Sequence, residues 1–168
     1  MLVYTYELFV ERSDILSAWQ NKYRYILIDE FQDVNQLQYE IVRMLANPRQ
    51  NLFIVGDDDQ SIYRFRGANP EIMLHVPRDY QDLELVSLDY NYRCPRDVVQ
   101  MADRLISHNR KRFPKEISAA KTQGDSITTD LLETQQEEYT RIVQRIRTSD
   151  TPLSQTAVLF RTNTQSRL

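Results

Sequence analysis

The chain has 168 residues, a length that fits one ordinary domain or parts of two and excludes a large multidomain assembly within these residues. Hydrophobic residues make up 41% and charged residues 27%, close to the globular average, which excludes a disordered, collagen-like or coiled-coil chain. The formal net charge of −3 is divided unevenly, with a net −7 over residues 1–92 and +4 over residues 93–168. We therefore expect two units, of which the second is better suited to meet phosphate.

Three further features limit the class of protein. None of the three glycines is followed by lysine, so these residues contain no Walker A loop of the form GxxxxGK[ST]. No run of 18 apolar residues exists, and the N-terminus carries acids where a signal peptide carries basic residues, so we expect a cytoplasmic protein without a membrane segment. The single cysteine, Cys94, cannot form an internal disulfide, which agrees with a reducing compartment.

The first half of the chain reads as helix, strand, helix, strand. Apolar spacing predicts an amphipathic helix over about residues 4–21, and a second over residues 36–46 that Asn47-Pro48 ends. Short apolar runs predict strands buried on both faces at residues 25–28 and 52–55. Asp29 and Glu30 follow the first strand directly, and the second strand ends at Gly56 and the acids that begin at Asp57.

The second half repeats this order. Pro95 is expected in the first turn of a helix that continues to about residue 106, and residues 110–125 are expected to form a loop. Alternating strands and helices predict βαβ units, a parallel sheet and therefore the α/β class. The remaining predicted elements are strands at 83–88, 127–132 and 156–160 and a helix at 137–147.

An apolar strand that leads straight into Asp29-Glu30 is the pattern of a Walker B element, which places one carboxylate to hold Mg²⁺ and a second to take a proton from water. A solvated strand end would show the same pattern, so context has to decide. Asp57, Asp58 and Asp59 suggest a metal cluster, but three successive acids are expected to point in different directions and lack the spacing of a calcium loop, so a polar turn is the preferred interpretation. The basic residues Arg110–Arg112 and Lys115 are interpreted as a solvated loop that touches phosphate.

Four strings supply that context: YILIDEFQDVNQLQ, NLFIVGDDDQSIYRFRGA, LDYNYRCP and AVLFRTNTQSR. In this order they closely resemble the UvrD/Rep/PcrA family of superfamily-one DNA helicases, from about residue 25 to residue 167. The resemblance implies parallel sheets of RecA-like (P-loop NTPase) motor domains. Residues 1–88 would be the C-terminal part of the first motor domain, and residues 89–168 the N-terminal part of the second.

The resemblance implies nucleotide chemistry at five positions. Asp29 would coordinate Mg²⁺, and Glu30 would be the catalytic base for attack of water on the γ-phosphate of ATP. Gln60 would sense the γ-phosphate and couple it to the DNA site. Tyr92 would stack on adenine, and Arg93 would be the arginine finger of the second motor domain, since a permanently charged guanidinium neutralises charge on the transferred phosphoryl group.

The resemblance also implies contacts with single-stranded DNA. Tyr63 and Phe65 resemble the aromatic residues that the family places against bases, although Trp is more common at the second position. Arg64 and Arg66 flank Phe65, and Arg66 would link the nucleotide and DNA sides. Further DNA contacts in the second motor domain would come from Arg161 and Asn163.

Together these assignments imply an internal fragment of an ATP-dependent DNA helicase that lacks the P-loop. The parent protein would move along single-stranded DNA, 3′ to 5′ by analogy, and unwind duplex from single-strand/double-strand junctions, for example in DNA repair. The isolated segment is expected to be inactive, because the P-loop supplies most of the triphosphate site. Exposed sheet edges would allow it to dimerise.

Three alternatives stay open at this point. The chain could be the motor segment of a helicase–nuclease subunit, which shares the same motifs. It could be a non-catalytic module that docks to another protein, although the intact Asp29, Glu30, Gln60 and Arg93 argue against natural degeneration. It could also be a magnesium-dependent nuclease that uses Asp29, Glu30 and the acids that begin at Asp57.

Overall fold

The computed structural model describes all residues except 122–123, 125–126, 163–164 and 166–168. The chain forms two compact units, residues 1–125 and residues 126–168, which are described separately below. The first unit contains α1 (Leu2–Glu11), α2 (Ser13–Lys22), β1 (Ile26–Ile28), α3 (Gln36–Ala46), β2 (Leu52–Ile54), α4 (Pro70–Asp79), β3 (Tyr90–Pro95), α5 (Arg96–Ile106) and β4 (Ser118–Lys121). The second contains α6 (Gln135–Thr148).

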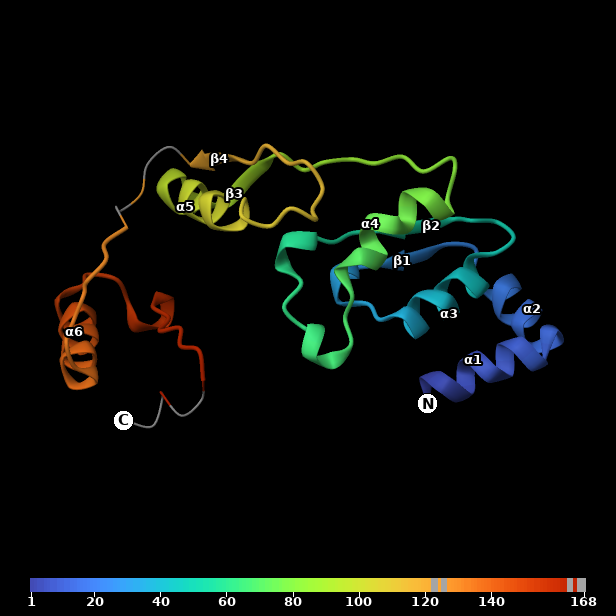
Figure 1. Cartoon of the computed structure of the whole chain (residues 1–168), viewed down its shortest axis with the longest axis horizontal. Coiled ribbons are helices and arrows are strands. Elements are labelled where there is room, and N and C mark those ends of the chain that lie inside the picture. Colours follow the sequence, from blue (N-terminus) through green and yellow to red (C-terminus); the bar gives the residue numbers. More distant parts are fainter. Residues whose placement is uncertain (122–123, 125–126, 163–164, 166–168) are drawn as a thin grey trace. The chain divides into compact units, whose positions relative to one another are not determined.

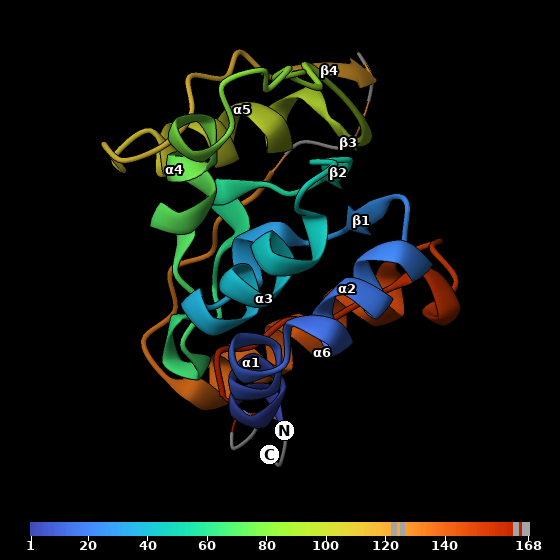
Figure 2. The same ribbon diagram turned by 90° about the vertical axis from the view of Figure 1, so that its right-hand side faces the viewer.

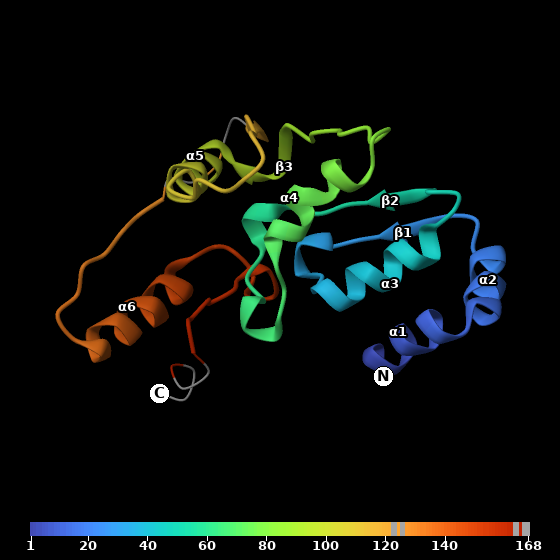
Figure 3. The same ribbon diagram turned by 45° about the vertical axis from the view of Figure 1, so that its right-hand side comes forward.

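Two parallel strand pairs organise the first unit. Strand β1 pairs with β2, with Ile26 opposite Leu52 and Ile28 opposite Ile54. Strand β3 pairs with β4, and α5 packs against this second pair. Helix α3 runs beside the β1–β2 pair (Figure 1), and the same arrangement is clear in the turned view of Figure 3. The predicted α/β class with parallel strands is confirmed.

The core lies between the β1–β2 pair and the helices α3 and α4. Phe31, Tyr39, Ile72 and Val76 are its buried members, and the rings of Phe31 and Tyr39 meet edge to face at 5.8 Å. The hydroxyl of Tyr39 donates a hydrogen bond to Asp79 Oδ2 at 2.6 Å, which ties the end of α4 to α3. This core supports the strand ends from which the acidic residues project.

Helix α3 follows its prediction to the residue. Asn35 and Gln38 form a reciprocal capping box, with both side-chain to backbone distances 2.9 Å, which satisfies two backbone amides at the start of the helix. Asn47-Pro48 follows its last residue. Helix α6 uses the same device, with Thr134 and Glu137.

Several expected elements differ from the structure. The helix expected at 4–21 is two helices, because Arg12 takes a non-helical conformation between α1 and α2 (Figure 2). Helix α4 was not expected. Pro95 ends β3 and caps α5 instead of lying in its first turn, and the expected loop 110–125 contains β4.

The strands expected at 83–88, 127–132 and 156–160 are absent from the described residues. A strand needs a hydrogen-bonded neighbour, and none of the described segments pairs with these runs, so Leu88 and Leu159 stay 82% and 91% exposed. The expectation of strands buried on both faces was also wrong. Leu27 of β1 and Phe53 of β2 are exposed on one face of the pair, while their neighbours are partly buried.

The second unit is held by polar contacts of α6. Asp130 accepts a hydrogen bond from Arg141 Nε at 3.0 Å and forms an ion pair with Arg145 Nη2 at 3.0 Å. Arg145 also donates a hydrogen bond to Thr128 at 2.6 Å. No helix in the described part of the chain is long and apolar enough to cross a membrane.

Candidate functional site

The candidate site begins where β1 ends. Asp29 and Glu30 follow the last residue of the strand, and both are exposed. Asp29 Oδ1 accepts a hydrogen bond from the backbone N–H of Glu30 at 2.9 Å. Glu30 has a left-handed backbone, with φ 52° and ψ 43°. A non-glycine residue in this region is held there by its surroundings, and such strain gathers at functional sites.

Gln32 connects the two acidic strand ends. Its side chain is buried, its Nε2 donates to Glu30 Oε2 at 2.7 Å, and its Oε1 accepts from the backbone N–H of Asp57 at 3.0 Å. Gly56 leaves the room for this bridge, since a Cβ there would lie 2.7 Å from Gln32 Oε1 and 3.1 Å from the Phe31 nitrogen. The bridge fixes the acid after β1 against the loop after β2.

That loop presents Gln60. Asp57 caps a short 3-10 helix, Asp58–Gln60, by accepting from the Asp59 N–H at 3.2 Å. The other oxygen of the Asp57 carboxylate accepts from Gln60 Nε2 at 2.7 Å. Because the Asp57 N–H donates to Gln32 and the Asp57 carboxylate accepts from Gln60, hydrogen bonds run without a break from Glu30 to Gln60.

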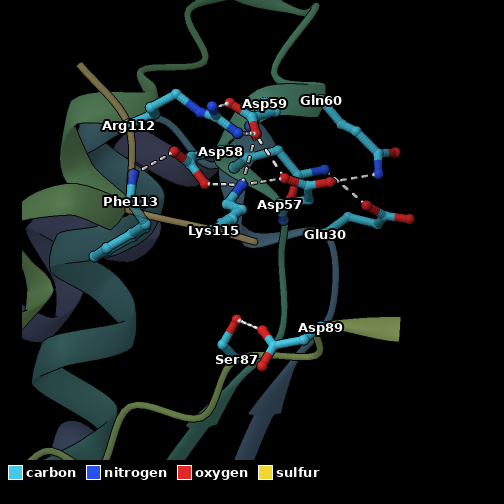
Figure 4. A network of polar contacts seen from close by, with 11 residues as sticks. Glu30, Asp57, Asp58, Asp59, Gln60, Ser87, Asp89, Arg112, Phe113 and Lys115 are labelled. Carbon is cyan, nitrogen blue, oxygen red and sulfur yellow. Dashed lines mark hydrogen bonds and ion pairs between the residues drawn. The ribbon is translucent and has the colours of Figure 1, made fainter. Parts of the chain in front are cut away.

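The three aspartates are neutralised by cations from much later in the chain. The Lys115 ammonium contacts all three carboxylates, at 2.5 Å for Asp57 and 3.0 Å for Asp59. Arg112 grips Asp59 with two hydrogen bonds, 3.0 Å from Nε and 2.7 Å from Nη2. Figure 4 shows Lys115 directed into the cluster. We refer to these five residues as the acid–base cluster.

Asp58 is the most buried member of the acid–base cluster. One of its oxygens accepts from the backbone N–H of Phe113 at 2.9 Å. The other receives no hydrogen bond, but it lies in ion-pair contact with the Lys115 ammonium. Two expectations are therefore corrected: the carboxylates of the polar turn do converge, and Arg112 and Lys115 are not solvated, with side chains only 15% and 14% exposed.

The charges of the cluster stabilise one another. Burial would raise the pKa of the Asp57 carboxyl, but hydrogen bonds from Lys115 and Gln60 outweigh burial and hold this pKa below its usual value. Burial would likewise lower the pKa of the Lys115 ammonium, but the three carboxylates outweigh it and the pKa is raised. Both groups therefore stay charged at neutral pH.

The aromatic residues of the same loop form a separate exposed surface. The rings of Tyr63 and Phe65 lie 6.0 Å apart and are tilted by 47°. The Arg66 guanidinium lies over both, 5.0 Å from the first ring centre and 5.4 Å from the second. Phe65 is 78% exposed, so its ring is open to a stacking partner. Arg64 is exposed beside it.

The other expected site residues are less constrained. Tyr92 and Arg93 are exposed on β3, and the described contacts of Arg93 are made by its backbone, to Asn91 and Lys121. Both belong to the same compact unit as Glu30, and no described hydrogen bond or ion pair joins Arg93 to Glu30. Arg161 is exposed in the second unit, and Asn163 lies outside the described residues.

Two family descriptions together account for nearly the whole chain. Residues 1–81 match the UvrD/REP helicase N-terminal domain, and residues 86–168 match the UvrD-like helicase C-terminal domain. The chain belongs to the UvrD/REP helicase family. The predicted resemblance is confirmed, whereas the seam expected between residues 88 and 89 stays a prediction.

Individual UvrD/REP helicases match over almost all of this chain. It is 44% identical over 169 residues to a protein of Bacillus subtilis named putative ATP-dependent DNA helicase YjcD, covering 96% of this chain and 22% of that protein. It is 39% identical to the ATP-dependent DNA helicase PcrA of Leuconostoc citreum, and 38% identical to PcrA of Staphylococcus epidermidis. These two matches cover 99% and 100% of this chain. The chain spans about a quarter of these relatives, with 23% and 24% of the two PcrA proteins covered.

Sequence reasoning missed the contacts of three residues at or beside this site, which are Gln32, Arg112 and Lys115. Gln32 is one of several polar residues that follow the acidic pair, and its burial in the structure reveals the bridge. Lys115 and Arg112 lie 53 to 58 residues beyond their partners, a separation that no local pattern reports. The one available signal was the charge contrast between the two halves of the chain.

Proposed function

We propose that this chain is a motor segment of an ATP-dependent DNA helicase that moves along single-stranded DNA and unwinds duplex. The observation that carries the proposal is the Gln32 bridge, which joins the acid after β1 to the Gln60 loop after β2. Ligands of parallel α/β sheets bind at the C-terminal ends of the strands, so this is the edge where a nucleotide would bind. The names of the relatives support the same reaction.

Within this proposal Glu30 takes the proton from the attacking water, and its held backbone fixes the direction of the carboxylate. Gln60 Nε2 faces the reacting phosphate when it is released from Asp57, and Arg93 contributes an exposed guanidinium from β3. Tyr92 offers a ring for the adenine base. These roles need no rearrangement of the core, since each of these residues is exposed.

The residues present fit a magnesium ion. Asp29 presents a carboxylate, the ligand type that Mg²⁺ prefers, and in the described hydrogen bonds only its Oδ1 is engaged, by the N–H of Glu30. Bound there, Mg²⁺ would neutralise charge on the phosphates. Asp29 would hold the ion, while Glu30 remains beside it for the proton.

The DNA surface in the proposal is the aromatic pair with its arginines. Tyr63 and Phe65 would stack on bases, with Arg64 and Arg66 near the phosphates. Stacking carries no sequence preference, because every base offers a ring face. Arg161 and Asn163 would add contacts from the second half of the chain, and single-strand/double-strand junctions would be the sites of entry, with movement 3′ to 5′.

The proposal is tested in the full-length protein that contains this chain. We expect ATP turnover that single-stranded DNA stimulates, and displacement of a strand from a duplex with a 3′ tail. Glu30→Gln should lower turnover by about 100-fold or more, because it removes the base, while oligo-dT binding is retained. Absence of DNA-stimulated turnover in the wild-type protein would refute the proposal, as would full turnover in Glu30→Gln.

A nuclease that uses the Asp57–Asp59 carboxylates is disfavoured by the acid–base cluster. Lys115 and Arg112 already neutralise these oxygens, so a metal ion would have to displace a buried ammonium. DNA cleavage with Mg²⁺ and no ATP would instead support the nuclease.

We also propose that the chain, assayed alone, neither binds ATP tightly nor hydrolyses it.

A further inference from the structure

The acid–base cluster contains a residue that reaches the candidate ATPase residues through one carboxylate. Lys115 Nζ bonds Asp57 Oδ1 at 2.5 Å, and Asp57 Oδ2 accepts from Gln60 Nε2 at 2.7 Å. In the described contacts Asp57 accepts no hydrogen bond from Arg112, because both hydrogen bonds of the Arg112 guanidinium go to Asp59. Lys115 therefore acts on the carboxylate that holds Gln60, whereas Arg112 does not.

We propose that Lys115 is a positioning residue for ATP hydrolysis, which sets the orientation of Gln60 through the Asp57 carboxylate. The inference rests on the proposed function, because that function gives Gln60 its role at the reacting phosphate. Lys115 itself would not touch the nucleotide. Its task is to fix the rotamer of Asp57. Gln60 then leaves this carboxylate, and returns to it, along one defined direction.

The geometry supports positioning in preference to simple charge balance. A carboxylate that is held on both oxygens has one allowed orientation, since rotation would break one bond or the other. The Asp57 backbone N–H is fixed as well, by Gln32 Oε1, so both the main chain and the side chain of this residue are constrained. In Figure 4 Asp57 lies between Lys115 on one side and Gln60 and Glu30 on the other, in this view.

The position of Lys115 also gives it a link to the second half of the sequence. It lies in the segment that matches the UvrD-like helicase C-terminal domain, while Asp57 and Gln60 lie in the segment that matches the N-terminal domain. A movement of the segment around Lys115 would change the restraint on Gln60 directly. The Lys115–Asp57 ion pair therefore connects the two family segments directly, next to Gln60.

The test uses the full-length protein that contains this chain, with DNA-saturated ATP turnover as the readout. Lys115→Ala should lower kcat by about 10- to 100-fold with KM for ATP changed by less than about threefold, because orientation matters most in the transition state. Lys115→Arg retains a cation that can bond Asp57 and should recover most of kcat. Asp57→Asn should lower kcat to a similar extent as Lys115→Ala.

Arg112→Ala is the matched control. It removes a cation of equal burial from the same cluster, at 15% against 14% exposed, without touching Asp57. A merely structural contribution would lower kcat equally in both variants, whereas positioning predicts that Arg112→Ala stays within about threefold of wild type. Lys111→Ala, which removes an exposed pair with Glu71, controls for surface charge.

Each outcome decides the matter. A selective loss of kcat in Lys115→Ala with rescue by Lys115→Arg supports the role. Equal losses in Lys115→Ala and Arg112→Ala, no loss in Lys115→Ala, or no rescue by arginine would overturn it while the proposed function stands. A wild-type protein without DNA-stimulated ATP turnover would overturn the proposed function, and this role with it.

Discussion

The side-chain amide of Gln32 donates a hydrogen bond to the carboxylate of Glu30, with 2.7 Å between Nε2 and Oε2. The same buried amide accepts the N–H of Asp57, so Gln32→Ala removes two bonds and leaves a partly buried N–H without its partner. We expect the free energy of unfolding to fall by about 1–3 kcal/mol, measured by urea denaturation of the chain. Gln36→Ala is the control, since Gln36 bonds Glu40 at the same distance on an exposed helix surface and its loss should cost less than about 0.5 kcal/mol. Equal losses would contradict the bridging role.

Gly56 and Gly67 should respond differently to the same substitutions, because close neighbours restrict Gly56 and a left-handed backbone restricts Gly67. Gly56→Ala brings a Cβ within 2.7 Å of Gln32 Oε1, and we expect a loss of about 1–3 kcal/mol from displaced neighbours. Gly67 has open space around it but a left-handed φ of 90°, so Gly67→Asn should be tolerated better than Gly67→Ala. Thermal unfolding of the four variants tests this, and Gly56→Asn should be no better than Gly56→Ala. Rescue of Gly56 by asparagine would show that its backbone, and not the close approach, is limiting.

The acid–base cluster should make the stability of the fold sensitive to acid. The pKa of Asp57 is lowered from an ordinary value of 3.8, so its contribution is complete above that pH and is lost as pH falls through the folded value. Lys115→Ala should cost about 3 kcal/mol at pH 7, because it leaves the buried Asp58 carboxylate and the partly buried Asp57 carboxylate without their cation. The difference from wild type should shrink as pH falls through the folded pKa of Asp57, because the Asp57 carboxylate then becomes protonated. A difference that is constant between pH 7 and pH 3, measured by urea denaturation, would show that packing and not charge is responsible.

Phe65 should tune the affinity for single-stranded DNA. Its ring is 78% exposed beside Tyr63, and a larger ring would offer more stacking area. We expect Phe65→Ala to weaken binding of oligo-dT by about 1–3 kcal/mol and Phe65→Trp to strengthen it, measured by fluorescence anisotropy with the full-length protein. Phe53→Ala is a control, because Phe53 is also exposed, on β2 away from this loop. Equal weakening by both alanine variants would argue against stacking at Phe65.

The parts of the fold that could be predicted are those whose determinants are local. Helix α3 carries its own start signal in Asn35 and its own stop in Asn47-Pro48, so the sequence defines both ends. The apolar runs before Asp29 and Asp57 likewise define β1 and β2 as a parallel pair. The family motifs identified the loop that carries Gln60 as part of the candidate site.

The remainder depends on partners that lie far away in the sequence. Residues 83–88 have the composition of a strand, yet without a paired neighbour they form none, and residues 84–88 are exposed. Strand β4 forms in a polar segment because Ser118 and Ala119 pair with Tyr90 and Asn91 of β3. The acid–base cluster also depends on distant residues, since the aspartates 57–59 are neutralised by cations that lie much later in the chain.

The spacing within the acid–base cluster has a consequence for how the protein is made. During synthesis the three aspartates leave the ribosome 53 to 58 residues before the arginine and lysine that neutralise them. Until then the loop carries three like charges close together, and Asp58 cannot be buried without a large desolvation cost. We therefore expect this loop to remain open in the nascent chain and to close in a late step, when translation has delivered Arg112 and Lys115.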